Sequence, residues 1–167
     1  FIVGNPPYLG QKKQSKNQKE DIKDIFGHLK SFKTLDYISC WFIKAARYIS
    51  GRDCMSFAFV TTSSICQGSQ VQQLWPRIFK LNLEITFAHR PFKWSNNAKG
   101  NAGIICSIVG INNTSENKPK FLFDGGVKQN VKNINPYLVV SDDNIIILFL
   151  KCLIFLHSIG ILLTFSF

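Results

Sequence analysis

The chain of 167 residues carries 20 lysines and arginines against 10 acidic residues, a formal net charge of +10 at neutral pH. This length is enough for one domain with a buried core, and the charge favours a polyanionic partner, either nucleic acid or an acidic membrane surface. Five scattered cysteines, without a CxxC pair or a Cys/His cluster, indicate neither a disulfide framework nor a zinc site and favour a reducing cytoplasm. Motifs of the types GxxxxGKS/T, GxSxG and HExxH do not occur in the sequence.

The first predicted element is a buried strand over residues 1–5. It begins at Phe1 without a cap or a linker, so we expect the chain to be a piece of a longer protein. Residues 9–34 are polar and rich in lysine, with a short helix around residues 18–26. We interpret this stretch as a solvated charged face, and the alternative is a loop that lies over a phosphate backbone.

Residues 35–50 have apolar side chains at helical spacing, with Asp36 as a cap or first-turn acid and Gly51 at the end. A strand over 55–62 and a helix over 64–80, which could break near Pro76, come next. Two further strands over 83–94 and 103–111 flank the turn-rich loop SNNAKGNA and predict an antiparallel hairpin. This order predicts a mostly parallel α/β sheet that finishes in the hairpin. A surface loop, INNTSENKPK, and a short strand and turn, FLFDGG, follow.

The last 23 residues, 145–167, have Lys151 and His157 as their only basic side chains and contain no acidic ones. The stretch is long enough to span a bilayer. Three interpretations are open, namely a tail anchor, a buried core helix, and a non-native stretch from a frame-shifted or truncated reading frame. We favour the third, for a reason given below.

The tetrapeptide Asn-Pro-Pro-Tyr, residues 5–8, follows the first strand and resembles the active-site signature of the amino-methyltransferases of DNA. The asparagine oxygen and the first proline carbonyl can each accept one hydrogen of the adenine amine, which aims its lone pair at a methyl donor. The prolines hold the turn rigid, and the tyrosine ring can stack on a flipped base. Such a displacement needs positioning more than acid–base catalysis, so the lack of a catalytic triad is no objection.

Four separated blocks, in order over residues 1–137, resemble the MmeI-like branch of adenine-specific DNA methyltransferases. The blocks are FIVGNPPYLGQKKQSKNQ, LDYISCWFIKAARYI, FAFVTTSSICQGSQVQQLW and FAHRPFKWSNNAKGNAGIICSIVGI. In that branch one polypeptide carries endonuclease, methyltransferase and target-recognition domains of a restriction-modification system. The resemblance implies the C-terminal part of a Rossmann-like class I methyltransferase fold, with S-adenosylmethionine as donor. It also implies N6 of adenine in double-stranded DNA as acceptor, with no metal required for methylation.

The resemblance assigns roles by position. The catalytic residues are Asn5, Pro6, Pro7 and Tyr8, and Asn5 also lies next to the donor. The block FAHRPFKW grips the flipped base, which makes Phe92 and Trp94 candidates for stacking, whereas Phe87 is expected to point into the sheet. The candidates for phosphate contacts are Arg90, Lys93 and Lys99. Residues Gln67, Gly68 and Gln70 open a helix after a strand, where ligands collect in α/β sheets, and helix capping is an equal alternative.

Two departures from the family pattern limit what we expect of the chain. The family's glycine-rich donor loop and its ribose-binding acid precede the NPPY motif, and no GxG with a following acid occurs here, since Asp124-Gly125-Gly126 comes too late. After NINPYLV the family continues with polar sequence, whereas this chain turns apolar, which is why we favour a frame-shift for 145–167. We therefore expect a catalytic half over 1–111, a connector over 112–144 toward a missing target-recognition domain, and a fragment inactive alone. The alternatives are a non-catalytic DNA-binding remnant and a small tail-anchored basic membrane protein.

Overall fold

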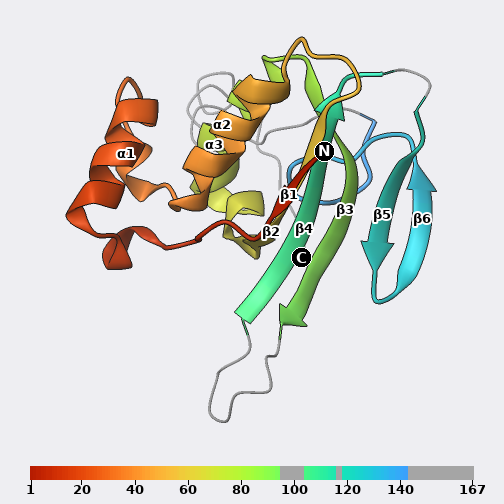
Figure 1. Cartoon of the computed structure of the whole chain (residues 1–167). Helices are drawn as coiled ribbons and strands as arrows, with labels where there is room; N and C mark the ends of the chain where they lie inside the picture. The colour runs from red at the N-terminus through yellow and green to blue at the C-terminus, as the bar shows by residue number, and fades with distance from the viewer. Residues whose placement is uncertain (95–103, 116–117, 143–167) are drawn as a thin grey trace, which may run out of the picture.

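A six-stranded mixed sheet forms the centre of the structure, a computed structural model that describes residues 1–94, 104–115 and 118–142 (Figure 1). The strands are β1 (Ile2–Gly4), β2 (Ser56–Thr62), β3 (Leu83–Trp94), β4 (Ile104–Asn113), β5 (Lys120–Asp124) and β6 (Val127–Val131). Their order across the sheet is β1-β2-β4-β3-β5-β6. Strands β1, β2, β3 and β5 run in one direction, and β4 and β6 run in the other.

The predicted α/β fold and the predicted hairpin are both confirmed, because β3 and β4 pair antiparallel from Leu83 opposite Asn113 to Trp94 opposite Ile104. The prediction of a mostly parallel sheet is wrong, because among the described strands only β1–β2 and β3–β5 pair parallel. The sequence did not predict that β4 also pairs with β2 and so separates the two parallel strands. It also did not predict β6, which pairs antiparallel with β5 beyond the turn at Gly125 and Gly126. Both glycines have positive φ, a conformation that glycine adopts without strain.

Three α-helices accompany the sheet: α1 (Lys16–Phe26), α2 (Ile38–Ile49) and α3 (Gly68–Phe79). Short 3-10 turns occur at η1 (Gln11–Lys13), η2 (Phe32–Thr34) and η3 (Ser63–Cys66). Figure 1 shows α2 and α3 beside the sheet and α1 on their far side. Helix α1 begins two residues earlier than predicted, because Ser15 and Gln18 form a reciprocal capping box at its start.

The helix predicted over 64–80 is wrong in its first turn. Residues 63–66 form η3, and α3 begins at Gly68, whose φ of +51° suits glycine. The predicted break near Pro76 does not occur, since α3 continues to Phe79. Fully buried Trp75 and Ile78 hold this last part of the helix by packing, and the Trp75 ring nitrogen donates to the carbonyl of Ile65 at 2.7 Å.

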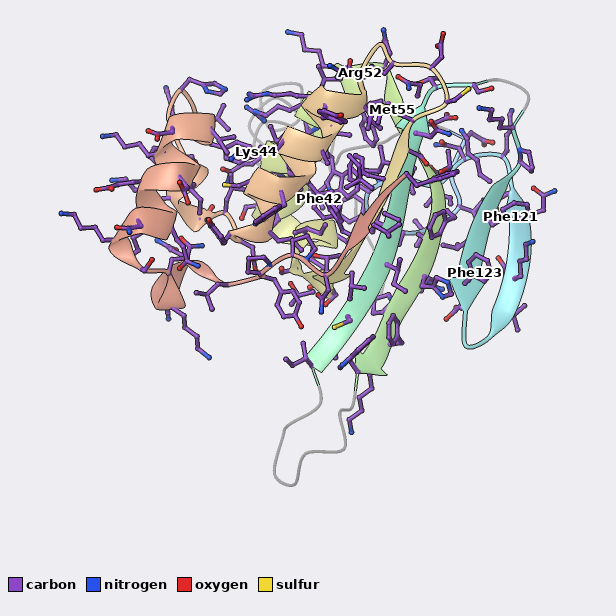
Figure 2. All side chains as sticks on the ribbon, in the orientation of Figure 1. Phe42, Lys44, Arg52, Met55, Phe121 and Phe123 are labelled. Carbon is purple, nitrogen blue, oxygen red and sulfur yellow. The ribbon has the colours of Figure 1, made fainter. Side chains whose placement is uncertain are left out.

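The core lies between α2, α3 and one face of the sheet. The Phe42 ring makes edge-on contacts with Phe57 and Phe59 of β2 and with Trp75 of α3, at centroid distances of 5.7, 5.4 and 6.1 Å. Figure 2 shows Phe42 on the side of α2 that faces the sheet. Burial of such aromatic side chains supplies a large share of the stabilisation of a domain of this size.

The opposite face of the sheet is less covered. Along β2, Phe57, Phe59 and Thr61 are buried, whereas the alternate residues Ala58 and Val60 are only half-buried. On this face the ring of Phe87 lies over Gly110, where an added Cβ would come within 2.1 Å of a ring carbon. Phe87 therefore packs, half-buried, against this face of the sheet, and Gly110 leaves the space that the ring occupies.

Residues 118–142, which follow the predicted catalytic half, join the same sheet and the same core. A buried ion pair connects Lys120 of β5 to Glu84 of β3, with 2.6 Å between Nζ and Oε2. Ile134 and Leu138 are fully buried in the core beyond β6. Within the described ranges, no helix is long and apolar enough to cross a membrane, and the apolar stretch 145–167 lies outside those ranges.

Candidate active site

The NPPY motif follows β1 directly and lies in the segment without regular secondary structure at the carboxyl end of that strand, which we call the NPPY turn. Pro6 is buried, whereas Asn5 and Pro7 are exposed and Tyr8 is half-buried. A proline cannot donate a backbone hydrogen bond, so Pro6 and Pro7 contribute no amide donors at the middle of the motif. The asparagine is therefore presented to solvent at an edge where parallel strands end, while the residue after it anchors the turn in the protein.

The backbone of Leu9, the residue after the motif, is held on both sides. Its N–H donates to Oδ1 of Asp36 at 2.8 Å, and its carbonyl accepts from the Gln14 side chain at 2.8 Å and from the Tyr37 N–H at 3.1 Å. Asp36 and Gln14 are each 6% exposed. Hydrogen bonds made by buried groups are costly to break, so these contacts fix the end of the NPPY turn.

Asp36 connects the turn to the corner that follows β2. Its Oδ1 also accepts from the Ile38 N–H at the start of α2, and its Oδ2 accepts from the Ser64 hydroxyl at 3.3 Å. The backbone N–H of Asp36 donates to the Gln70 side chain of α3 at 3.0 Å. One buried carboxylate therefore ties the carboxyl-end turns of two neighbouring parallel strands to each other. The sequence presented Asp36 as a helix cap, and nothing in the local pattern indicated its bond to Leu9.

Tyr8 lies against Cys106 of β4. Burial raises the pKa of the Tyr8 phenol, and its hydrogen-bonding contact with the Cys106 thiol raises it further. Burial likewise raises the pKa of Cys106. Cys106 is opposite Thr62 of β2 and Phe92 of β3. Its contact with Tyr8 therefore places the NPPY turn next to the ends of β2 and β3.

Phe92 and Trp94 lie next to each other at the end of β3. Their ring centroids are 6.2 Å apart at an interplanar angle of 48°. Phe92 is directly opposite Cys106, and Trp94, 46% exposed, is opposite Ile104. Residues that alternate along a strand share a face, so the two rings belong to the same face as the Cys106 thiol that Tyr8 contacts. The structure thus brings Tyr8 and Phe92 to Cys106, with Trp94 beside Phe92.

Comparisons with known proteins identify the family of the chain. Residues 1–124 match the family model described as "MmeI, DNA-methyltransferase domain". The chain belongs to this family. It is 47% identical over 147 residues to DNA methyltransferase A of Bacillus subtilis (strain 168). The aligned region is 88% of this chain and 16% of that protein. It is also similar to the type IIL restriction-modification enzyme MmeI, solved in complex with DNA, with a TM-score of 0.79 and 42% identity.

The chain spans about a sixth of the length of DNA methyltransferase A and 20% of the MmeI chain. The MmeI match covers 86% of this chain, so it extends over the sheet as well as the NPPY turn. At this level of identity the match establishes the predicted methyltransferase fold. The roles of individual side chains have to be argued from their positions and contacts in the structure.

The predicted phosphate contacts fall into three different situations. Arg90 forms an ion pair with Asp124 of β5, at 2.8 Å between Nη1 and Oδ2, and both side chains are about half exposed. Lys93 is exposed and has no ion pair among the described residues. Lys99 lies outside the described residues. Of the three predicted cations, therefore, one is already partnered and one is available to a ligand.

Of the residues predicted to bind a ligand at the start of α3, Gln70 makes structural hydrogen bonds. The Gln70 side chain accepts from the Asp36 N–H and donates to the Thr34 carbonyl at 2.6 Å. It therefore links α3 to the segment before α2 and does not cap its own helix. Gln67, at the N-cap position, is exposed and makes no side-chain cap bond.

Sequence reasoning missed Gln14 and Cys106 as well as the second role of Asp36. Asp36 and Cys106 lie far along the chain from Leu9 and Tyr8, which they contact. Gln14 is only five residues from Leu9. Within the described parts of the chain, no group of three or more His, Cys, Asp or Glu side chains could hold a metal ion.

Proposed function

We propose that the chain forms the amine-holding half of an adenine-specific DNA methyltransferase site within a restriction-modification enzyme. The reaction would transfer a methyl group from S-adenosylmethionine to N6 of a flipped adenine in double-stranded DNA. The observation that carries the proposal is the presentation of Asn5, exposed beside the buried Pro6 on a turn that Asp36 holds at Leu9. The relationship to an MmeI enzyme solved in complex with DNA supports DNA as the substrate.

The chemistry follows from the turn. The Asn5 side-chain oxygen and the Pro6 carbonyl each accept one hydrogen of the adenine amine, whose lone pair is otherwise delocalised into the ring. These two bonds orient the nitrogen, and fixed acceptors cost no reorganisation during the reaction. S-adenosylmethionine, when bound, supplies an electrophilic methyl group on a sulfonium. Formation of the N–C bond would break the S–C bond of the sulfonium, so that the donor leaves as S-adenosylhomocysteine, and the amine would release one proton to water as it becomes N6-methyladenine. The two acceptors on the turn stabilise the developing positive charge on nitrogen.

Aromatic side chains hold the flipped base in this proposal. The Tyr8 ring stacks on the base, and its contact with Cys106 fixes the ring against β4. Phe92 and Trp94, on the same face as Cys106, provide a second stacking surface. Stacking on an aromatic ring contributes about 1–3 kcal/mol per base, enough to offset part of the cost of unstacking the base from the duplex.

Donor binding needs more than this chain in our proposal. Asn5 is exposed at the carboxyl end of β1, which suits a contact with the donor methyl group. The glycine pair Gly125-Gly126 does not suit donor binding beside Asn5, because it forms the turn between β5 and β6, at the opposite edge of the sheet from β1. Titration of S-adenosylmethionine into the chain by calorimetry tests this point. Heat of binding with micromolar affinity would contradict it, and no heat at millimolar donor with duplex DNA still bound would support it.

The reaction is tested in a hybrid in which residues 1–142 replace the matching segment of DNA methyltransferase A. We expect duplex DNA treated with this hybrid to contain N6-methyladenine, detected by mass spectrometry of its nucleosides. Asn5→Ala should lower the rate about 100- to 1,000-fold, the effect of removing one preorganised electrostatic contact, while DNA binding persists. Asn130→Ala, an exposed asparagine on β6, is the matched control and should leave the rate unchanged. Methylcytosine alone, or an Asn5→Ala hybrid of full activity, would overturn the proposal.

A further inference from the structure

A cavity of about 410 Å³ lies between α1, η1 and η2, on the lysine-rich stretch that follows the NPPY turn. Four lysines line it, Lys16, Lys19 and Lys23 from α1 and Lys33 from η2, and we call this site the lysine pocket. The three α1 lysines are three and four residues apart, so they lie along one side of the helix. Glu20 is the only acidic residue among those that line the pocket.

The positive charge of the pocket is not neutralised within the described part of the chain. Residues 11–33 contain seven lysines against three acids. Of those acids, Asp21 accepts a hydrogen bond from the Tyr37 hydroxyl at 2.7 Å, and neither Asp21 nor Asp24 lines the pocket. The ion pairs among the described residues join Arg90 to Asp124 and Lys120 to Glu84, and none involves a pocket lysine.

The pocket is built on anchored elements. The capping box of Ser15 and Gln18 fixes the start of α1, and Ile22 and Phe26 are buried at 2% and 1% exposure. Phe32 is half-buried and forms an apolar part of the wall. The lysines therefore project from a fixed helix, which lowers the entropy that a ligand must remove on binding.

Gln14 connects the pocket to the candidate active site. It lines the pocket, and its side-chain nitrogen donates to the carbonyls of Leu9 and Leu35 at 2.8 and 2.9 Å. Leu9 is the residue directly after the NPPY motif. A ligand bound in the lysine pocket therefore has a fixed position relative to the turn that carries Asn5.

From these observations we propose that the lysine pocket binds the phosphate backbone of DNA beside the target adenine, an inference that rests on the proposed DNA substrate. The α1 lysines extend over about 10 Å of helix axis, at 1.5 Å per residue. One DNA strand carries a phosphate about every 3.4 Å of axis, so this row of charges suits a run of about three phosphates. The Phe32 wall gives an apolar surface for a deoxyribose between them.

The test measures binding of the full chain to a 20-base-pair DNA duplex by fluorescence anisotropy over a range of salt concentrations. The pocket variant carries Lys16→Gln, Lys19→Gln and Lys23→Gln, which remove charge and keep good helix-forming residues. The control variant carries Lys80→Gln, Lys118→Gln and Lys132→Gln, which remove the same charge at exposed positions outside the pocket. Circular dichroism of both variants checks that the helices persist.

For the pocket variant we expect the slope of log affinity against log salt to fall in magnitude by about 2–3, because each lost phosphate contact removes about 0.9. The control variant should change the slope by less than about 1. Equal changes in the two variants, or no duplex binding by the unmodified chain, would overturn the inference. Displacement of the duplex by polyglutamate of equal charge, at equal potency, would overturn the assignment to nucleic acid. Failure of the proposed reaction is distinguishable, since it is judged separately by N6-methyladenine in the hybrid.

Discussion

The NPPY turn and the end of the β3–β4 hairpin face the same cysteine but are held in opposite ways. Buried hydrogen bonds of Asp36 and Gln14 fix the turn at Leu9. At the hairpin end, Trp94 is 46% exposed, and Lys93 beside it is exposed as well. One side of the candidate site is thus set by the fold, and the other presents side chains at the surface.

The proposed chemistry explains why the two sides differ. An amine can be aimed at a methyl donor only by acceptors that are already in place, so the Asn5 turn has to be rigid. Stacking on a base tolerates changes in orientation because every base has an aromatic face. Side chains at an exposed strand end meet that requirement without a supporting network.

Removal of the buried Asp36 carboxylate should have the largest effect on stability, because this group holds the rigid side of the candidate site. Asp36→Ala leaves the amides of Leu9 and Ile38 without their acceptor, and an unsatisfied buried donor costs about 1–3 kcal/mol. We expect the free energy of unfolding, measured by urea denaturation, to fall by about 3 kcal/mol. Asp53→Ala, at an exposed position on the same chain, is the control and should change it by less than about 0.5 kcal/mol. Equal losses in the two variants would show that Asp36 does not hold the turn.

The sequence predicted the parts of this site that depend on local pattern. The NPPY turn after a strand, the helix over α2 and the β3–β4 hairpin follow from a motif, from apolar spacing and from a turn-rich loop. The position of β4 between β2 and β3 could not be predicted, because residues about 50 apart in sequence form that pairing. The bond from Asp36 to Leu9, over 27 residues, was missed for the same reason. At Pro76 the local rule predicted a break, and packing of Trp75 and Ile78 overrode it.

Truncation of half-buried Phe92 and exposed Trp94 should separate binding of the base from stability. In the hybrid enzyme, Phe92→Ala with Trp94→Ala should weaken capture of a flipped base about tenfold or more, given 1–3 kcal/mol for each stacked base. Fluorescence of a 2-aminopurine at the target position measures the capture. The control Trp41→Ala, an exposed aromatic on α2 with 42% exposure, should leave the fluorescence unchanged. Loss of thermal stability comparable to that of Asp36→Ala would contradict the difference between the two sides.

The rate at which Cys106 is alkylated measures how well the NPPY turn covers its thiol. Burial raises the pKa of its thiol, so at pH 8 less thiolate is present than at an unperturbed cysteine, and alkylation by iodoacetamide is slow. Alkylation should become faster as the pH rises. Tyr8→Ala uncovers the thiol, and we expect labelling of Cys106, followed by mass spectrometry, to become faster because burial of the thiol is reduced. Buried Cys66, whose pKa burial also raises, should stay unlabelled in both proteins. Labelling of Cys106 and Cys66 together would instead indicate unfolding.

The smallest effects are expected at the ion pair between Arg90 and Asp124. Both side chains are about half exposed, so the pair contributes about 0.2–1 kcal/mol to stability and less at high salt. If Arg90 contacts a phosphate, Asp124 competes with DNA for it. Asp124→Asn should then strengthen duplex binding a few-fold at low salt, whereas Arg90→Gln should weaken it, as measured by fluorescence anisotropy. In the double variant the effect of Asp124→Asn should largely disappear, because the arginine that it releases is gone. An equal gain in affinity with and without Arg90 would mean that Asp124 acts only through the overall charge of the chain.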